Sequence, residues 1–365
     1  MIRERKKETK TDTVLLILVL LLAVFGLVML FSISEYNGRV RFGDSACYFK
    51  KQLFATALGM GVMYMVSSID YHFFLRLGPV AYLISMFLSG AVLFVGQEIN
   101  GSKRWLNLGP LSFQPSEFAK VAVIFFLACL VSRNVQRMKR FRTMILMMIP
   151  VLPIVGLVGA SNLSTAIIIL GIAVVLIFVA DPKYVRFILM GSIGVGFMTV
   201  FLAMESYRLE RLAIWRHPEQ YEKGYQTLQG LYAIGSGGLF GRGLGNSVQK
   251  LGFLPEAQND MIFSIICEEI GLFGAIFVII VFGVMLWRIA HVAQNAPDLF
   301  GTLLVSGVFA HIAIQVVLNI AVVTNFIPNT GVSLPFISYG GTSETILLAE
   351  IGLVLNVSSK IRLES

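Results

Sequence analysis

The sequence predicts an all-α, polytopic integral membrane protein, and three observations lead to this fold class. Of the 365 residues, 56% are hydrophobic and only 14% are charged, proportions too apolar for a soluble globular protein. The mean hydropathy is +0.79. The apolar residues also gather in long runs, each close to the roughly 20 residues that a helix needs to cross a bilayer.

We count ten such runs and expect each to be a transmembrane helix. The first is too long for a signal peptide and no small-residue cleavage site follows it, so we expect it to stay in the protein. The whole chain, residues 1–365, is therefore predicted to be one membrane domain. The predicted spans are 13–34, 51–68, 77–95, 115–132, 142–160, 163–180, 184–204, 261–287, 299–323 and 342–358.

The positions of Lys and Arg predict the orientation of the helices. One basic cluster lies in residues 3–10 and another in residues 133–142, and ten helices place both on one side. By the positive-inside rule this side is the cytoplasm, so both termini are expected there. Residues 205–258, between the seventh and eighth helices, then form one large extracytoplasmic loop. Most of the formal net charge of +8 is accounted for by the cytoplasmic clusters, so we expect no nucleic acid partner.

Two carboxylates lie where the large loop meets the eighth helix. If that helix begins at Pro255, a residue suited to the first helical position, Glu256 and Asp260 share one face at the membrane surface. Burial there would raise the pKa of a carboxyl group, which suits a general base near neutral pH. The alternative is a pair that complements the helix dipole. Glu268 and Glu269 lie roughly 12–14 Å deeper, and we expect them to pack or pair.

Further polar residues lie inside predicted helices. Glu117 and Lys120, three residues apart, share a face of the fourth helix. Mutual pairing would explain them, but an intramembrane ion pair is also a candidate functional site. His311 and Gln315 share a face of the ninth helix, and we expect His311 to be a hydrogen-bonded core residue.

The outer loops carry cations and glycines. Lys103 and Arg104 form either an interfacial anchor or an anion-binding loop. Seven glycines lie in residues 230–245. This segment is not a P-loop, because no Gly-Lys-Ser/Thr follows and no strand precedes it. It is either a flexible loop or a backbone that closely approaches another chain or a lipid headgroup. Residues 325–343 are expected to form re-entrant or cavity-lining backbone.

Together these groups describe a site for an anionic amphiphile at the outer face of the membrane. Nucleoside triphosphates are not available there, so a substrate must carry its own leaving group. A lipid-linked pyrophosphate does so, with Lys and Arg stabilising the departing charge and a carboxylate taking a proton from the attacking hydroxyl.

Three motifs resemble the signatures of the SEDS family (shape, elongation, division and sporulation), which includes FtsW, RodA and SpoVE. The resemblance covers essentially the whole chain, and the segment 243–250 looks more like FtsW than RodA. Two segments depart from the family pattern. Ser161-Asn162 stands where an acidic residue is common, and Gln258-Asn259 replaces His-Thr or Gln-Thr. The motifs are Gln-Pro-Ser-Glu-Phe-Ala-Lys (114–120), Leu-Pro-Glu-Ala-Gln-Asn-Asp-Met-Ile-Phe (254–263) with Glu-Glu-Ile-Gly (268–271), and Phe-Ile-Ser-Tyr-Gly-Gly-Thr-Ser (336–343).

The resemblance implies a peptidoglycan glycosyltransferase that polymerises lipid II during division, at the outer face of the bacterial plasma membrane. By carry-over, Asp260 is the catalytic base for the 4-hydroxyl of the acceptor sugar. The implied cofactor is a divalent cation, Mg²⁺ or Mn²⁺, with Asp260 as a candidate ligand and no nucleotide. Substrate-binding residues are expected to be Lys103, Arg104, Glu117, Lys120, Arg242, Lys250, Glu256, Ser338, Tyr339, Gly340 and Gly341.

The expected partners are lipid II, the nascent glycan strand, a class B penicillin-binding protein that crosslinks the strands, other divisome proteins and membrane lipids. Three alternatives stay open: a lipid II flippase, an elongation- or sporulation-type polymerase, and a catalytically silent scaffold. We favour the enzyme over the flippase because the charged groups are expected near the outer face rather than in a relay through the membrane midplane.

Overall fold

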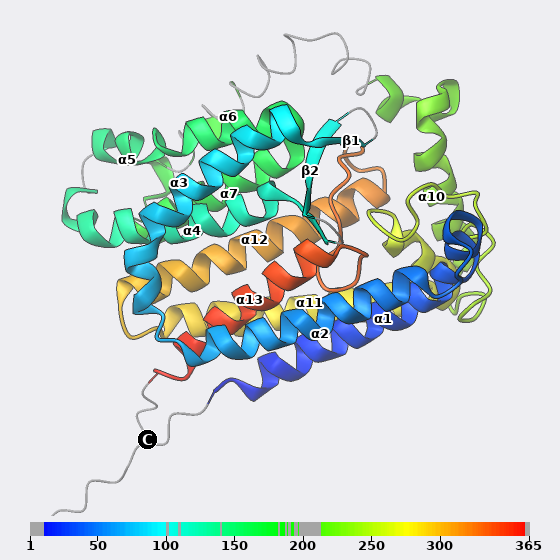
Figure 1. The fold of residues 1–365 in the computed structure, drawn as a ribbon, viewed down its shortest axis with the longest axis horizontal. Helices are drawn as coiled ribbons and strands as arrows, with labels where there is room; N and C mark the ends of the chain where they lie inside the picture. The colour runs from blue at the N-terminus through cyan, green and yellow to red at the C-terminus, as the bar shows by residue number, and fades with distance from the viewer. Residues whose placement is uncertain are drawn as a thin grey trace, which may run out of the picture.

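Long helices packed side by side form most of the protein (Figure 1). The computed structural model describes residues 11–99, 102–108, 111–138, 141–181, 183–186, 188, 191–192, 196 and 213–361. The helices are α1 (Thr13–Phe42), α2 (Cys47–Ser68), α3 (His72–Val95), α4 (Pro115–Asn134), α5 (Phe141–Met148), α6 (Val151–Ser161), α7 (Leu163–Ala180), α10 (Tyr225–Gly237), α11 (Ile262–Gln294), α12 (Leu299–Val323) and α13 (Gly341–Ser358), with short 3₁₀ turns at Val135–Arg137, Pro218–Gln220 and Glu222–Gly224.

The helices confirm a polytopic all-α membrane protein. Six of those that the structure describes, α1, α3, α4, α7, α11 and α12, are long and apolar enough to cross a membrane, and α5 with α6 would make a seventh span. Those two are bent by 41° around Pro150 and Pro153, residues that remove backbone donors. The second and tenth predicted spans correspond to α2 and α13, which pack together. The seventh, 184–204, lies largely outside the described residues, so the total of ten stays a prediction.

A small antiparallel meander, which the sequence did not lead us to expect, joins α3 to α4. Its strands are β1 (Gln97–Ile99), β2 (Ser102–Leu108) and β3 (Leu111–Phe113), paired in the order β1-β2-β3. Trp105 lies opposite Gln97, and Leu106 lies opposite Phe113. Strands β1 and β2, helix α10 and the connection between α12 and α13 lie at one end of the bundle, away from the C-terminus (Figure 1).

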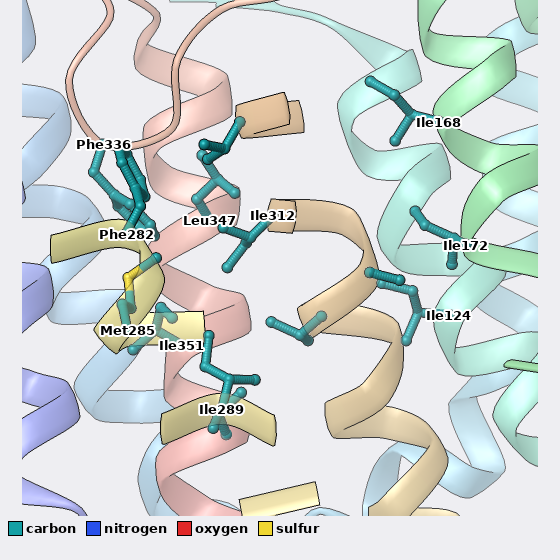
Figure 2. Close-up of a cluster of buried hydrophobic side chains, with 14 of the residues drawn as sticks. Ile124, Ile168, Ile172, Phe282, Met285, Ile289, Ile312, Phe336, Leu347 and Ile351 are labelled. Carbon is teal, nitrogen blue, oxygen red and sulfur yellow. The ribbon is translucent and has the colours of Figure 1, made fainter. Parts of the chain in front are cut away.

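Branched, aromatic and methionine side chains from five helices and one loop meet in a buried cluster of the core (Figure 2). Apolar residues also remain exposed on the outside, for example Phe87 of α3 and Trp287 of α11, which are 75% and 62% exposed. Such surfaces suit contact with lipid. The labelled core residues are Ile124, Ile168, Ile172, Phe282, Met285, Ile289, Ile312, Phe336, Leu347 and Ile351, all of them at most 2% exposed.

The predicted outer loop contains helix α10 and then folds back onto a break in α11. Gly271 has φ 75° and is not helical, so backbone groups around it lose their helical partners. Two N–H groups of residues 238–250 donate to the carbonyls of Glu268 and Glu269 at 2.9 Å, and the N–H of Leu272 donates back to the same segment at 2.9 Å. These bonds satisfy the broken backbone, as a low-dielectric environment requires.

Glycine is required at the point of closest approach. Gly241 has φ +77°, and a Cβ there would lie 2.2 Å from the carbonyl oxygen of Glu269, a distance no side chain tolerates. Of the two interpretations of this glycine-rich segment, a close backbone approach describes Gly241, which meets α11 of the same chain. Contact of the segment with another chain or a lipid headgroup stays a prediction.

Candidate active site

Asp260 lies in a turn directly before α11. Helix α11 begins at Ile262, one residue after the start of the predicted span 261–287, and not at Pro255, the start that would have placed Glu256 and Asp260 on one helical face. Glu256 has φ 53°, a left-handed conformation that cannot continue a helix. The Asn259 side chain donates to the Glu256 carboxylate, a local bond of the kind that competes with helix formation. The two carboxylates are therefore brought together by a turn and not by helical spacing.

Amide groups from three elements surround Asp260. Its side chain is buried, with 8% of the residue exposed. Gln226 of α10 places Nε2 at 3.4 and 3.5 Å from the two carboxylate oxygens, and Asn329 Nδ2 donates to Gln226 Oε1 at 3.1 Å. Asn319 of α12 donates to the backbone carbonyl of Asp260 at 2.8 Å. The carboxylate is thus held in position while its own hydrogen bonds are long.

This environment raises the pKa of Asp260 to about 7, chiefly through burial and then through the negative charge of Glu256, and the Gln226 amide opposes the shift. A carboxyl group with this pKa exchanges a proton near neutral pH, which is the property a general base needs.

The ion pair predicted on α4 is present and buried. Lys120 Nζ lies 2.9 Å from Glu117 Oε1, with side chains 1% and 8% exposed. The same ammonium donates to Gln315 Oε1 of α12 at 3.0 Å. The pair is therefore joined to α12 and is not an isolated feature of α4.

Helix α12 connects this ion pair to the Asp260 turn through one face. Gln315 donates to the carbonyl of Ser333 at 3.1 Å, and Asn319, one turn further, donates to the carbonyls of Val332 at 2.7 Å and Asp260 at 2.8 Å. Both amides thus hold the α12–α13 connection, and Asn319 also holds the residue that carries the candidate base. His311, one turn before Gln315, is hydrogen-bonded as expected.

Arg242 and Lys250, two of the expected substrate contacts, help to hold the segment 238–250 against α11. Lys250 Nζ lies 2.9 Å from Glu269 Oε1, with both side chains at most 4% exposed, and it donates to Ser32 of α1 at 2.8 Å. Arg242 is 42% exposed and lies 3.6 Å from Glu268. The expectation that Glu268 and Glu269 pack or pair is confirmed, and none of these described contacts reaches Asp260.

The cations of the meander are placed differently from one another. Arg104 Nε donates to the carbonyl of Ser161 at 2.9 Å, so this guanidinium closes the end of α6. Lys103 lies next to it on β2 and is half-buried. Asn162 stands where an acidic residue is common in the family that the sequence resembles. Its side-chain oxygen accepts from the N–H of Thr165 at 3.2 Å and caps α7.

Residues 338–341 form the entry to α13 and contact the Asp260 turn. The N–H of Tyr339 donates to the carbonyl of Gln258 at 2.9 Å. Ser338 Oγ accepts from Leu334 at 2.8 Å, and the N–H of Gly340 donates to Gln52 of α2 at 3.0 Å. Gly341 starts α13 and leaves 3.4 Å between an added Cβ and Ala55. This segment shapes the site through its backbone.

Two functional candidates were missed by sequence reasoning. Asn319 continues the spacing of four begun by His311 and Gln315, so this polar stripe in an apolar helix was a usable signal. Gln226 had no such signal, because its segment was interpreted as a loop and not as helix α10. Among the residues that the structure describes, no three His, Cys, Asp or Glu side chains are grouped to hold a metal ion.

The fold and this site define a class of protein: a multi-pass membrane protein with a buried carboxyl group at the end of a transmembrane helix and a buried ion pair connected to it through a neighbouring helix. The FtsW/RodA/SpoVE family, described as cell cycle proteins, matches residues 12–363. The chain belongs to this family.

Relatives and solved structures agree with this membership. Stage V sporulation protein E of Bacillus subtilis (strain 168) is 39% identical over 358 residues, covering 96% of this chain and 98% of the relative. A probable peptidoglycan glycosyltransferase FtsW of Thiomicrospira cyclica is 37% identical over 360 residues, covering 96% and 92%.

Two solved structures share the fold. One comes from work on the structural coordination of polymerization and crosslinking by a peptidoglycan synthase complex; it has a TM-score of 0.80 at 29% identity and covers 97% of this chain and 99% of that chain. The crystal structure of the rod shape determining protein RodA of Thermus thermophilus has a TM-score of 0.71 at 28% identity, covering 97% and 98%.

Proposed function

We propose that this protein is a peptidoglycan glycosyltransferase that polymerises lipid II, with Asp260 as the general base. The observation that carries the proposal is the buried Asp260 carboxyl group, whose pKa is about 7, held at the start of α11 by Asn319 and Gln226. The names of several relatives, probable peptidoglycan glycosyltransferases, support the same reaction class.

In this reaction Asp260 removes the proton from the acceptor sugar hydroxyl as the hydroxyl oxygen bonds to the anomeric carbon of the donor. The bond from that carbon to the lipid diphosphate breaks, and the diphosphate leaves with the electron pair. Lys120 has three N–H donors, two of them directed at Glu117 and Gln315. We assign the third, with Lys103 and Arg104, to the diphosphate oxygens, where positive charge stabilises the transition state.

The proposed setting is the outer face of the bacterial plasma membrane, with both termini in the cytoplasm. A class B penicillin-binding protein is the proposed partner, since one similar structure belongs to a peptidoglycan synthase complex that coordinates polymerisation and crosslinking. Other divisome proteins and the surrounding lipids are further proposed partners.

Two cellular roles are supported by specific observations. A division role is favoured by residues 243–250 and by the FtsW relatives. A sporulation role is favoured by the 39% identity to a stage V sporulation protein. Depletion in growing and in sporulating cells separates the two, because the first role predicts filaments and the second predicts spores with defective walls.

A divalent cation is the proposed cofactor. Asp260 and Glu256 would hold the ion, since carboxylates are hard oxygen ligands and Mg²⁺ is typically held by one or two carboxylates with substrate phosphates and water. Such an ion would supply additional positive charge to the leaving diphosphate. Chelation is expected to stop polymerisation, and Mg²⁺ or Mn²⁺ is expected to restore it. Full activity after exhaustive chelation would remove the ion from the proposal.

A lipid II flippase is the competing function. The sequence argued against a flippase because charged groups were expected near the outer face and not in a relay through the membrane. That argument is weakened, because His311 and Glu350 form a buried contact in the middle of α12 and α13. Ionisable groups are therefore not confined to the outer ends of the helices. The enzyme proposal therefore rests on the environment of Asp260 and not on a lack of ionisable groups in the middle of the helices.

The test uses the purified full-length protein with lipid II in detergent, where no membrane separates two compartments. Wild type should form polymer, and Asp260→Asn should lower the rate by about 100-fold or more, as expected for loss of a general base. Asp44→Asn is the matched control, since Asp44 is an exposed acid paired with Lys50. Translocation in vesicles without polymer in detergent, or an active Asp260→Asn variant, would refute the proposal.

A further inference from the structure

A chain of buried polar contacts leads from the Glu117–Lys120 pair to the middle of helices α12 and α13. Lys120 Nζ and His311 Nε2 both lie at Gln315 Oε1, at 3.0 and 2.9 Å. His311 Nδ1 lies 2.8 Å from Glu350 Oε2 on α13. His311 and Glu350 are both 0% exposed.

The contacts fix where the protons are. Gln315 Nε2 donates to the carbonyl of Ser333, so Oε1 is the atom that faces Lys120 and His311. An ammonium only donates and an amide oxygen only accepts. His311 Nε2 must therefore carry a proton and donate it to Gln315. The remaining proton lies between His311 Nδ1 and the Glu350 carboxylate, so the two residues together are neutral.

We propose that His311 and Glu350 are positioning residues for Lys120, acting through Gln315. Glu350 holds the imidazole ring in place, the ring donates to Gln315 Oε1, and this oxygen holds the Lys120 ammonium beside Glu117. The inference deepens the proposed polymerase function and rests on it, because Lys120 is the group it positions for the diphosphate.

A flipped amide shows what the histidine prevents. If Gln315 rotated by half a turn, its NH₂ group would face the ammonium of Lys120, donor against donor, and Oε1 would face the carbonyl of Ser333, acceptor against acceptor. Donation from His311 adds a second bond that only the observed orientation accepts. The carboxamide is thereby locked between two donors on one side and the α12–α13 connection on the other.

Packing alone does not account for a buried acid and a buried imidazole here. Neighbours along the same helices, Ile312, Leu347 and Ile351, are apolar, fully or almost fully buried, and belong to the hydrophobic cluster of Figure 2. Apolar residues of similar volume often replace a buried ion pair without loss of stability, whereas removing one partner is strongly destabilising. This asymmetry allows a positioning role to be separated from a structural one.

The experiment compares His311→Phe, Glu350→Leu and the double variant in the full-length protein, with melting temperature, kcat and KM for lipid II as readouts. Each single variant should have a lower melting temperature than wild type, and the melting temperature of the double variant should be close to that of wild type. Its kcat should nevertheless stay about 10-fold or more below wild type with KM within about twofold, because misplacing a catalytic group affects the transition state most. A double variant with wild-type kcat would overturn the proposal.

Two further variants keep the test decisive if the double variant is unstable. Glu350→Gln can still donate to Nδ1 and should keep most of the wild-type kcat. Gln315→Met removes the shared acceptor but leaves His311 and Glu350 paired, so it should reproduce the loss of kcat. Wild-type kcat in Gln315→Met contradicts the positioning role. An inactive wild-type protein instead contradicts the polymerase function, so the two failures are distinguishable.

Discussion

The side-chain amide of Asn319 donates to the backbone carbonyl of Asp260 at 2.8 Å and, with the same nitrogen, to the carbonyl of Val332 at 2.7 Å. One fully buried residue of α12 therefore joins the turn that carries the candidate base to the connection that leads into α13. This bond positions Asp260 through its backbone, while the carboxylate has the long contacts from Gln226 and can take up a proton.

Asn319→Leu should lower the polymerisation rate and leave the specificity for lipid II unchanged. The substitution leaves two buried carbonyls without a donor, at a cost of about 1–3 kcal/mol each, and lets the turn relax. A displacement of about 1 Å at a reacting group can cost roughly 100-fold in rate. We expect kcat to fall at least 10-fold, measured by polymer formation from lipid II. Asn295→Ala, at the exposed end of α11, is the control; equal kcat in both variants would show that the bond does not position Asp260.

The pH dependence of the rate should report the Asp260 carboxyl group. Its pKa is about 7, and a base acts only when ionised, so the rate should fall as the pH drops through 7. Glu256→Gln removes a negative charge that raises this pKa, so the acidic limb should move to lower pH by about half a unit or more. Glu222→Gln, an exposed acid, should leave the limb in place. A limb that moves in neither variant would assign it to another group.

The raised pKa of Asp260 also affects the stability of the folded protein, and in the opposite direction: the rate rises with pH, whereas the stability falls. Between the unfolded pKa near 4 and the folded pKa near 7, the folded state holds a proton that the unfolded state has released, so stability falls as the pH rises through this window. Asp260 therefore costs stability at neutral pH, which is consistent with a residue kept for its chemistry rather than for the fold.

Sequence reasoning predicted the parts of this protein that depend on composition and helical spacing. Nine of the ten predicted spans correspond to described helices, and Glu117 and Lys120 pair as their spacing of three indicates. It failed where tertiary contacts decide. Nothing local shows that residues 241–243 close a break at Gly271, or that Lys250 meets Ser32 from a helix more than 200 residues away.

Lys250 should contribute far more to stability than a surface lysine whose ion pair has the same N···O distance. Lys250 and Glu269 lie 2.9 Å apart with side chains 4% and 0% exposed, and Lys50 and Asp44 lie 2.9 Å apart with side chains 66% and 44% exposed. Removing one partner of a buried pair typically costs about 3–5 kcal/mol, against about 0–1 kcal/mol at the surface.

Thermal unfolding in detergent checks this difference. Lys250→Met should melt many degrees below wild type, and Lys50→Met should melt within a few degrees of it. Adding Glu269→Leu to Lys250→Met should recover much of the loss. If the Lys250→Met variant melts normally but binds lipid II poorly, the lysine is a substrate contact after all and not an anchor.

Two glycines with similar backbone angles provide a test of the contact at the α11 break. Gly241 has φ +77° and Gly245 has φ +85°, but a Cβ at Gly241 would lie 2.2 Å from the carbonyl oxygen of Glu269, and a Cβ at Gly245 meets nothing within 4 Å.

Gly245→Ala should therefore cost only the strain of the left-handed conformation, roughly 1–2 kcal/mol. Gly241→Ala carries the same strain and also forces residues 241–243 away from Glu268 and Glu269, which exposes backbone groups that only these bonds satisfy. We expect this variant to lose most of its folded yield and to show faster hydrogen exchange at Leu272, whose N–H depends on the same contact. Equal yields and equal exchange in the two variants would mean that the break in α11 does not need the glycine segment to close it.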